Sequence, residues 1–277
     1  MPLNPFDLTG GPFLLLYIIL LLLATIAAFR IPQWLRADGR AGQSLDADHL
    51  AYLSGGRTRY IDTLVARLLT AGLLTLSGRH KLMSKGAGQG QTAAEMCVLA
   101  LPGEFGWSAI QRAAIDYAEP VRRDLVRRHL LIDDDKVLLL RLWQTLPLAA
   151  LLLFGAIKWE VGTMRDRPVG FLTVLLVLTF IFAIIRFASV DRRTWAGIAA
   201  LEDARLGADR LRRAAVSDEI PLAVALFGTT VLIGSYWSDY HDLRRASSND
   251  GGSNSSDSSS DSGCGGGGCG GCGGGGD

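Results

Sequence analysis

Three cysteines near the end of the chain have the residue type and spacing to bind a metal or form cross-links. Cys264, Cys269 and Cys272 are separated only by glycines, four and then two. Cys269 and Cys272 have the spacing of half a zinc site, but a closed structural zinc site needs four ligands and the tail supplies three. Ordering a glycine-rich loop is also costly in entropy. We keep these cysteines as metal-ligand candidates, but we predict no bound metal and no cofactor.

The segment that carries the cysteines, residues 246–277, is rich in glycine and serine, and we predict that it is disordered. Such a composition cannot bury enough apolar surface to fold. Two interpretations of its cysteines stay open. They are incidental residues in a low-complexity spacer, or they form disulfide cross-links to another chain outside the cell.

Elsewhere, the residue types that carry out catalysis form no recognisable motif. The four histidines fall in separate segments, at His49, His80, His129 and His241. The zinc-protease, nucleophile-elbow and phosphate-loop motifs are absent. No acidic residue interrupts an apolar run, so the sequence shows no proton relay. We predict no catalytic residue and favour a non-enzymatic protein.

Residues 30–85 are expected to form a small winged-helix-like α+β unit. Apolar residues recur at helical spacing between Ile61 and Leu69, after a break at 54–56 that follows a shorter helix-like stretch. A turn at Ser77–Gly78 then separates two short strand-like segments, which predicts a hairpin. Helix, helix and hairpin is the outline of a winged helix.

Five basic residues of this unit could contact phosphates of a partner or a nucleic acid. They are Arg57, Arg59 and Arg67 on the second helix, with Arg79 and Lys81 at the tip of the hairpin. The alternative is that they are polar surface of a small packing domain. We favour this alternative, because the helix has no extended basic face, and we expect no nucleic-acid partner.

Four apolar runs predict the membrane-spanning helices. They cover residues 13–29, 143–158, 170–187 and 221–237. The mean hydropathy of +0.25 is high for a soluble protein, whereas the net charge of +1 points to no particular partner. The fold class is therefore mainly α: a helical membrane protein with about four spans and one small α+β unit, in contact with the lipid bilayer.

The remaining segments connect these elements. They are a short N-terminus at 1–12, a linker with helices at 86–141, and an amphipathic helix at 191–216. The amphipathic helix is expected either to lie along the membrane surface or to pack on the winged-helix-like unit.

Basic residues predict the orientation. Sixteen Lys and Arg lie between Arg30 and Arg141, and seven lie between Arg186 and Arg213. With four spans both stretches fall on one side, which the positive-inside rule makes cytoplasmic. We predict a multi-pass protein of the bacterial inner membrane, with residues 30–141 in the cytoplasm and with the N-terminus and tail outside. If residues 221–237 do not span, the tail moves inside.

Several motifs together resemble a family of uncharacterised bacterial membrane proteins. The matching elements are the Leu-Ala-Tyr-Leu-Ser-Gly-Gly-Arg segment at 50–57, the Gly-Leu-Leu step at 72–74, the Arg-Pro-Val-Gly-Phe element at 167–171 and the Gly/Cys-rich tail. The resemblance covers nearly the whole chain. It implies a membrane location, no established activity and no catalytic residue.

We therefore predict a non-enzymatic envelope scaffold or interaction protein with an unidentified protein partner. Two alternatives remain. One is a membrane-tethered winged-helix regulator that binds DNA, and the other is a membrane protein whose Cys-rich tail is modified or cross-linked.

Overall fold

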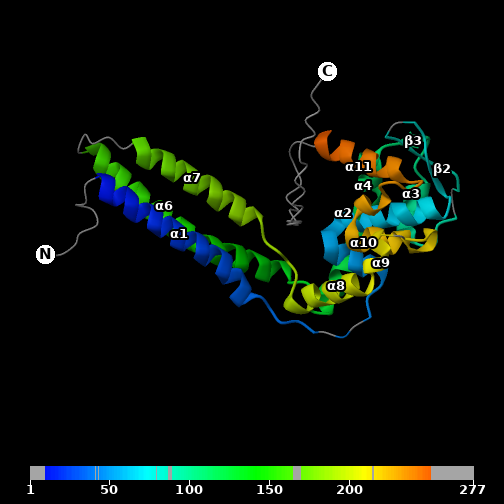
Figure 1. Cartoon of the computed structure of the whole chain (residues 1–277), viewed down its shortest axis with the longest axis horizontal. Helices are drawn as coiled ribbons and strands as arrows, with labels where there is room; N and C mark the ends of the chain where they lie inside the picture. Colours follow the sequence, from blue (N-terminus) through cyan, green and yellow to red (C-terminus); the bar gives the residue numbers. More distant parts are fainter. Residues whose placement is uncertain are drawn as a thin grey trace, which may run out of the picture.

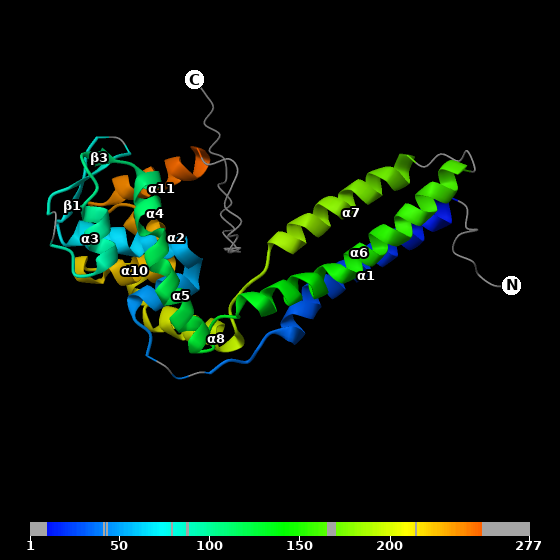
Figure 2. The same ribbon diagram turned by 180° about the vertical axis from the view of Figure 1, so that it is seen from behind.

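The computed structural model describes residues 10–40, 42, 44–78, 80–86, 89–164, 170–213 and 215–250. This part of the chain is mainly helical and forms two parts (Figure 1). Three long helices lie together as a bundle, and shorter helices form a folded domain at one end of it. The chain passes between the two parts three times, and these passages converge at one end of the domain (Figure 2).

The bundle consists of three helices that are long and apolar enough to cross a membrane. They are α1 (Gly10–Leu35), α6 (Asp134–Met164) and α7 (Gly170–Ala188). Each contains one of the first three predicted apolar runs, which supports a membrane protein. Helix α6 begins well before its apolar run and reaches the folded domain.

Small and polar side chains bring the bundle helices together. Gly155 of α6 lies so close to its neighbours that a Cβ there would be 2.8 Å from the Tyr17 ring and from the Leu176 side chain. The Tyr17 hydroxyl of α1 donates a hydrogen bond to Thr179 Oγ1 of α7 at 3.2 Å. A glycine at a close approach and a hydroxyl bond between helices are typical of packing in membranes.

The fourth apolar run does not form a span. Residues 221–237 are divided between α10 (Ile220–Phe227), the 3₁₀ helix η3 (Thr229–Leu232) and a turn. Eight residues of α-helix extend only about 12 Å, far less than the hydrocarbon thickness of a bilayer. Residues such as Ala223 and Val224 are completely buried in the folded domain. The expected transmembrane helix here is a core helix, because an apolar run suits either environment.

The folded domain is built around α2 (Ala47–Thr70), which packs along α10. Non-helical backbone at Gly55 and Gly56 breaks α2 at the position where the sequence predicts a break. The Ser54 hydroxyl of α2 donates a hydrogen bond to the carbonyl oxygen of Ala225 in α10. The central helix pair therefore joins segments that are about 170 residues apart in the chain.

A three-stranded antiparallel sheet follows α2. The predicted hairpin is present as β1 (Leu74–Leu76) and β2 (Leu82–Ser84), with Leu74 opposite Ser84. A strand that was not predicted, β3 (Glu104–Phe105), pairs with β2 and completes the order β1-β2-β3.

Further helices of the domain come before and after the α6–α7 segment in the sequence. Before it come α3 (Ala93–Leu99), α4 (Trp107–Ala114), the 3₁₀ turn η1 (Ile115–Tyr117) and α5 (Ala118–Arg127). After it come α8 (Trp195–Gly207), α9 (Asp209–Arg213), the 3₁₀ turn η2 (Ser217–Glu219) and α11 (Ser238–Asp250). The predicted unit at 30–85 is thus only part of a larger domain, in which its helix packs on helices from the end of the chain.

The predicted amphipathic helix at 191–216 is two helices, α8 and α9, and it packs on the domain. Leu201 of α8 is buried in a cluster with Leu50 of α2 and Leu226 of α10. Of the two expected positions for this segment, the structure therefore shows the one against the domain.

Candidate functional site

Arg67, one of the predicted contact residues, is held inside the domain by two carboxylates. Its guanidinium forms ion pairs with Asp48 of the same helix and, at 3.2 Å, with Glu95 of α3. Only 3% of the Glu95 side chain is exposed. Arg67 therefore joins α2 to α3 and is not available for a phosphate.

Two more of the predicted residues also have carboxylate partners. Arg57 pairs with Glu119 of α5 at 3.3 Å, and Lys81 pairs with Glu104 of β3 at 3.3 Å. Arg79 lies outside the described residues. The charges of Arg57, Arg67 and Lys81 are therefore compensated within the molecule.

The structure does not describe the segment that carries the cysteine candidates. Cys264, Cys269 and Cys272 lie outside the described residues, and Cys97 is half-buried, with its thiol donating to the carbonyl oxygen of Ala113 at 3.4 Å. Among the residues that the structure does describe, no group of three His, Cys, Asp or Glu could hold a metal ion.

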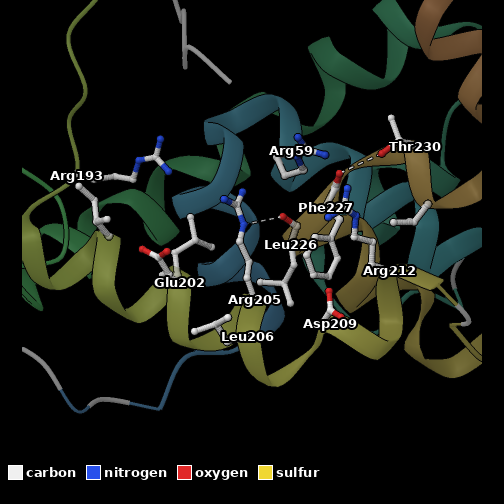
Figure 3. Close-up of a pocket in the computed structure, with 13 residues that line it drawn as sticks. Arg59, Arg193, Glu202, Arg205, Leu206, Asp209, Arg212, Leu226, Phe227 and Thr230 are labelled. Carbon is white, nitrogen blue, oxygen red and sulfur yellow. Dashed lines mark hydrogen bonds between the residues drawn. The ribbon is translucent and has the colours of Figure 1, made fainter. Parts of the chain in front are cut away.

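Arg59, another of the predicted residues, lines a cavity, which we call the arginine groove. The groove lies between α2, α8, α9, α10 and η3 and has a volume of about 700 Å³ (Figure 3). Its charged lining consists of Arg59, Arg193, Arg205, Arg212, Glu202 and Asp209. Its apolar lining consists of Ile198, Leu201, Leu206, Leu226, Phe227 and Val231, with Thr230 beside them.

Two glycines make room for the Arg59 side chain at the groove. A Cβ at Gly55 would lie 2.8 Å from the Cβ of Arg59, and a Cβ at Gly228 would lie 1.7 Å from its Nη1. Gly228 also has a φ of +88°, which side-chain-bearing residues rarely adopt. The guanidinium therefore lies directly against the backbone that ends α10.

The remaining arginines of the groove differ in their contacts. Arg205 donates from Nε to the carbonyl oxygen of Leu226 at 3.2 Å, which directs its guanidinium along the groove (Figure 3). Arg193 is engaged by Asp191 at 3.1 Å. Within the described part of the chain, Arg59 and Arg212 form no ion pair. The groove thus combines an apolar wall with two uncompensated guanidinium groups.

Sequence reasoning included Arg59 but missed the rest of the groove. Arg205 and Arg212 belong to the predicted amphipathic helix at 191–216, and Phe227 belongs to the predicted span at 221–237. The sequence does show charged residues every few positions along 193–212. No local sequence pattern, however, indicates that α10 lies beside these residues.

The three connecting segments between the domain and the bundle form a second notable feature, which we call the neck. It comprises residues 36–40, 129–134 and 188–196. Backbone amides of Trp195 and Ala196 donate to the carbonyl oxygens of Ala37 and Asp38, at 3.1 and 2.8 Å. The amide of Ile132 donates to the Arg192 carbonyl oxygen at 2.8 Å. The segment 188–196 is therefore hydrogen-bonded to both of the other segments.

Thr194 and two glycines allow this close approach. The Thr194 hydroxyl caps α8 by accepting from the Gly197 amide at 3.1 Å, and it lies 2.9 Å from the carbonyl oxygen of His129. A Cβ at Gly39 would lie 2.5 Å from that same carbonyl oxygen, and one at Gly197 would lie 2.2 Å from the Leu130 oxygen. There is no space for a larger residue at Gly39 in the neck or at Gly197 at the start of α8.

Ion pairs hold the segments of the neck together and connect the neck to α5. Asp191 pairs with Arg36 at 3.3 Å and with Arg193, and the Arg36 guanidinium lies 5.3 Å from the ring centre of Trp195. Asp134 at the start of α6 pairs with Arg122 of α5 at 3.0 Å. These contacts fix the end of the bundle to the domain.

Comparison of the chain with protein-family models, curated proteins and solved structures gave no match. The family resemblance given above stays a prediction.

Proposed function

We propose that the protein is a non-enzymatic interaction protein that holds its folded domain at the cytoplasmic face of the bacterial inner membrane. The observation that carries this proposal is the neck. Three connections, one of which is hydrogen-bonded to both of the others, hold a domain in one orientation far better than a single flexible linker would. Such an anchor suits a domain that must present a fixed surface to a protein partner beside the membrane.

The distribution of basic residues supports the orientation. With three spans, all but three of the 28 Lys and Arg residues lie on the domain side of the bundle. The three exceptions are Lys158, Arg165 and Arg167 at the opposite end. The positive-inside rule then puts the domain in the cytoplasm.

The same orientation bears on the cysteine tail. With three spans, the residues that follow α11 lie on the domain side, and a cytoplasmic location keeps thiols reduced. We therefore propose a tail on the cytoplasmic side of the membrane, whereas four spans predict a tail outside the cell. A cytoplasmic tail gives less support to disulfide cross-links with an extracellular chain.

Cysteine labelling tests the orientation. The four natural cysteines are replaced by serine, and a single cysteine is introduced at Met164 or at Leu206, whose side chains are 77% and 73% exposed. In spheroplasts, an impermeant maleimide is expected to label Met164→Cys directly and Leu206→Cys only after lysis. The reverse pattern would contradict the proposed orientation.

Cross-linking in cells tests the interaction. The full chain is compared with a chain in which residues 44–131 and 191–250 are replaced by short polar linkers, so that the three spans remain. We expect a stoichiometric protein partner to be cross-linked to the full chain and to be missing from the chain of spans. Recovery of equal amounts of the cross-linked partner with both chains would assign the interaction to the bundle and contradict the proposal for the domain.

A further inference from the structure

We infer that the arginine groove is a binding site for a soluble organic phosphate of nucleotide size. This site goes beyond the protein partner proposed above, since it gives the domain a small-molecule ligand of its own. The inference rests on the size of the groove, its two uncompensated arginines and the carboxylates beside its apolar wall.

The size and lining of the groove match a small-molecule site. A volume of about 700 Å³ falls within the usual range for such sites, which is roughly 300 to 1,000 Å³. Phe227 at the end of α10 and the exposed Leu206 of α8 supply an apolar wall (Figure 3). A ring or another flat apolar body can lie against this wall, whereas a bare inorganic anion would leave it in contact with water.

The arginines provide the charge for a phosphate. Most arginines of the domain are used internally: Arg57, Arg67 and Arg244, for example, all pair with carboxylates. Arg59 and Arg212 have no such partner in the described part of the chain, and both line the groove. A guanidinium binds phosphate through two parallel hydrogen bonds, so an uncompensated pair in one cavity selects an anion of this kind.

The backbone around Arg59 leaves room for the guanidinium of this arginine at the end of α10. Gly228 adopts a conformation that other residues avoid, and any side chain there would overlap the guanidinium. The nitrogen of Arg205 that binds the Leu226 carbonyl holds a second guanidinium next to the same wall. The groove is therefore partly preorganised for an anion, which reduces the entropy cost of binding.

The two carboxylates limit which anions fit. Glu202 and Asp209 also line the groove, and a carboxylate repels a phosphate but accepts hydrogen bonds from hydroxyl and amino groups. A ligand that carries its phosphate at one end and its donors at the other satisfies both kinds of charge. Nucleotides have this arrangement, with donors on the sugar and the base.

The same phosphate chemistry could come from a lipid headgroup. None of the lining residues belongs to α1, α6 or α7, and all but Arg193 come from helices of the folded domain. We therefore assign the site to a soluble ligand and make a lipid one of the outcomes of the test.

The test uses the full chain in nanodiscs of neutral phosphatidylcholine and isothermal titration calorimetry. The probes are adenosine diphosphate, guanosine diphosphate, adenosine and inorganic phosphate. At least one diphosphate is expected to bind at least tenfold more tightly than adenosine and than phosphate. No binding by either diphosphate would overturn the inference and leave the protein-partner proposal untouched.

Matched variants place the binding in the groove. Arg212 is exposed, so Arg212→Gln should not disturb folding, and it is expected to weaken diphosphate binding about tenfold or more. Arg210→Gln on the same helix is the control, because Arg210 pairs with Glu219 and does not line the groove. Equal binding by both variants would contradict the assigned site.

Lipid composition separates the two sources of phosphate. Nanodiscs that contain phosphatidylglycerol should leave diphosphate binding within about twofold of its value in neutral lipid. Competition by phosphatidylglycerol that Arg212→Gln abolishes would instead assign the groove to a lipid headgroup and overturn the soluble ligand.

Discussion

Asp62 of α2 is a buried carboxylate that holds the last helix of the domain in place. It accepts hydrogen bonds from the Tyr240 hydroxyl at 2.9 Å and from Arg244 Nε at 2.6 Å, both on α11. The Arg244 guanidinium also lies 3.7 Å from the ring centre of Trp107. Burial raises the pKa of Tyr240 well above its ordinary value, with the nearby Asp62 charge as a further cause. Tyr240 therefore stays a neutral donor.

Replacing Asp62 tests this role. Asp62→Asn leaves the half-buried Arg244 without its counter-charge, which should cost about 3 to 5 kcal/mol of unfolding free energy. The expected signature is faster amide hydrogen exchange in α11 of the full chain in detergent. Asp239→Asn, on the exposed side of α11, is the control and should leave exchange unchanged. Similar exchange in both variants would show that α11 is held mainly by apolar contacts.

Glu119 makes the stability of the domain depend on pH. Hydrogen bonds from Arg122, together with the charges of Arg122 and Arg57 and a hydrogen bond from Arg123, lower the pKa of Glu119 from 4.5 to about 2. A carboxyl group with a lowered pKa stabilises the folded state above its unfolded pKa, and this contribution is lost as the pH falls from about 4.5 towards 2.

The variant Glu119→Gln should therefore have a lower Tm than the unmodified protein at pH 7. The difference between the two Tm values should shrink as the pH falls from 4.5 to 2.5, because Glu119 becomes protonated. Thermal unfolding followed by circular dichroism in detergent measures both values. A constant difference over this range would mean that Glu119 acts through packing and not through its charge.

At the scale of elements, the break in α2 depends on backbone conformation and not on space. Gly56 has φ +63° and ψ −152°, a region that is almost restricted to glycine, although nothing lies within 4 Å of a Cβ built there. The break lets the two halves of α2 take different directions, so that Ser54 reaches α10.

Two glycine-to-alanine variants test the backbone strain at Gly56, because neither added methyl group meets a neighbouring atom. Gly56→Ala should lower the unfolding free energy by about 1 to 3 kcal/mol. Gly207→Ala also meets nothing within 4 Å, but its φ is not in the positive range, so it should be neutral or slightly stabilising. The two variants can be compared by thermal unfolding. Equal Tm values would show that residue 56 tolerates a side chain and that α2 is not held at this break.

Local sequence patterns predicted several elements correctly for identifiable reasons. The helix that contains Ile61 to Leu69 and the hairpin around Ser77–Gly78 follow from periodicity and turn residues, which act over a few neighbours. Strand β3 has two residues and carries no periodic signal. Helix α10 was assigned to the membrane because lipid and a protein core both favour the same apolar residues.

At the scale of the whole molecule, the domain is formed by two separate parts of the chain with the membrane hairpin between them. The isolated bridge between Leu131 and Arg193 brings the ends of these parts together. The α6–α7 hairpin is thus an insertion into the domain, and the neck is the place where it enters and leaves.

This arrangement predicts that the domain can be separated from the membrane. A chain that joins residues 44–131 to 191–250 through a short Gly-Ser linker should fold as a soluble monomer, because both halves of the core are present and the ends to be joined are adjacent. Residues 44–131 alone should not fold, since α2 would lose α10 and expose its buried face. Size-exclusion chromatography and amide chemical-shift dispersion measure the outcome, and aggregation of the joined chain would show that the domain needs the bundle.

The sequence by itself determined the three helices that are long and apolar enough to cross a membrane, the break in α2 and the β1–β2 hairpin, because composition and short-range periodicity control these features. Only the tertiary structure decided that the fourth apolar run is a core helix, that Arg57 and Arg67 are paired internally, and that Arg59 meets Arg205 and Arg212 in one groove. Each of these depends on contacts between segments that are far apart in the chain. The physical reason is that the type of a residue, apolar or charged, indicates the surroundings in which it is stable. It does not indicate which distant segment provides those surroundings.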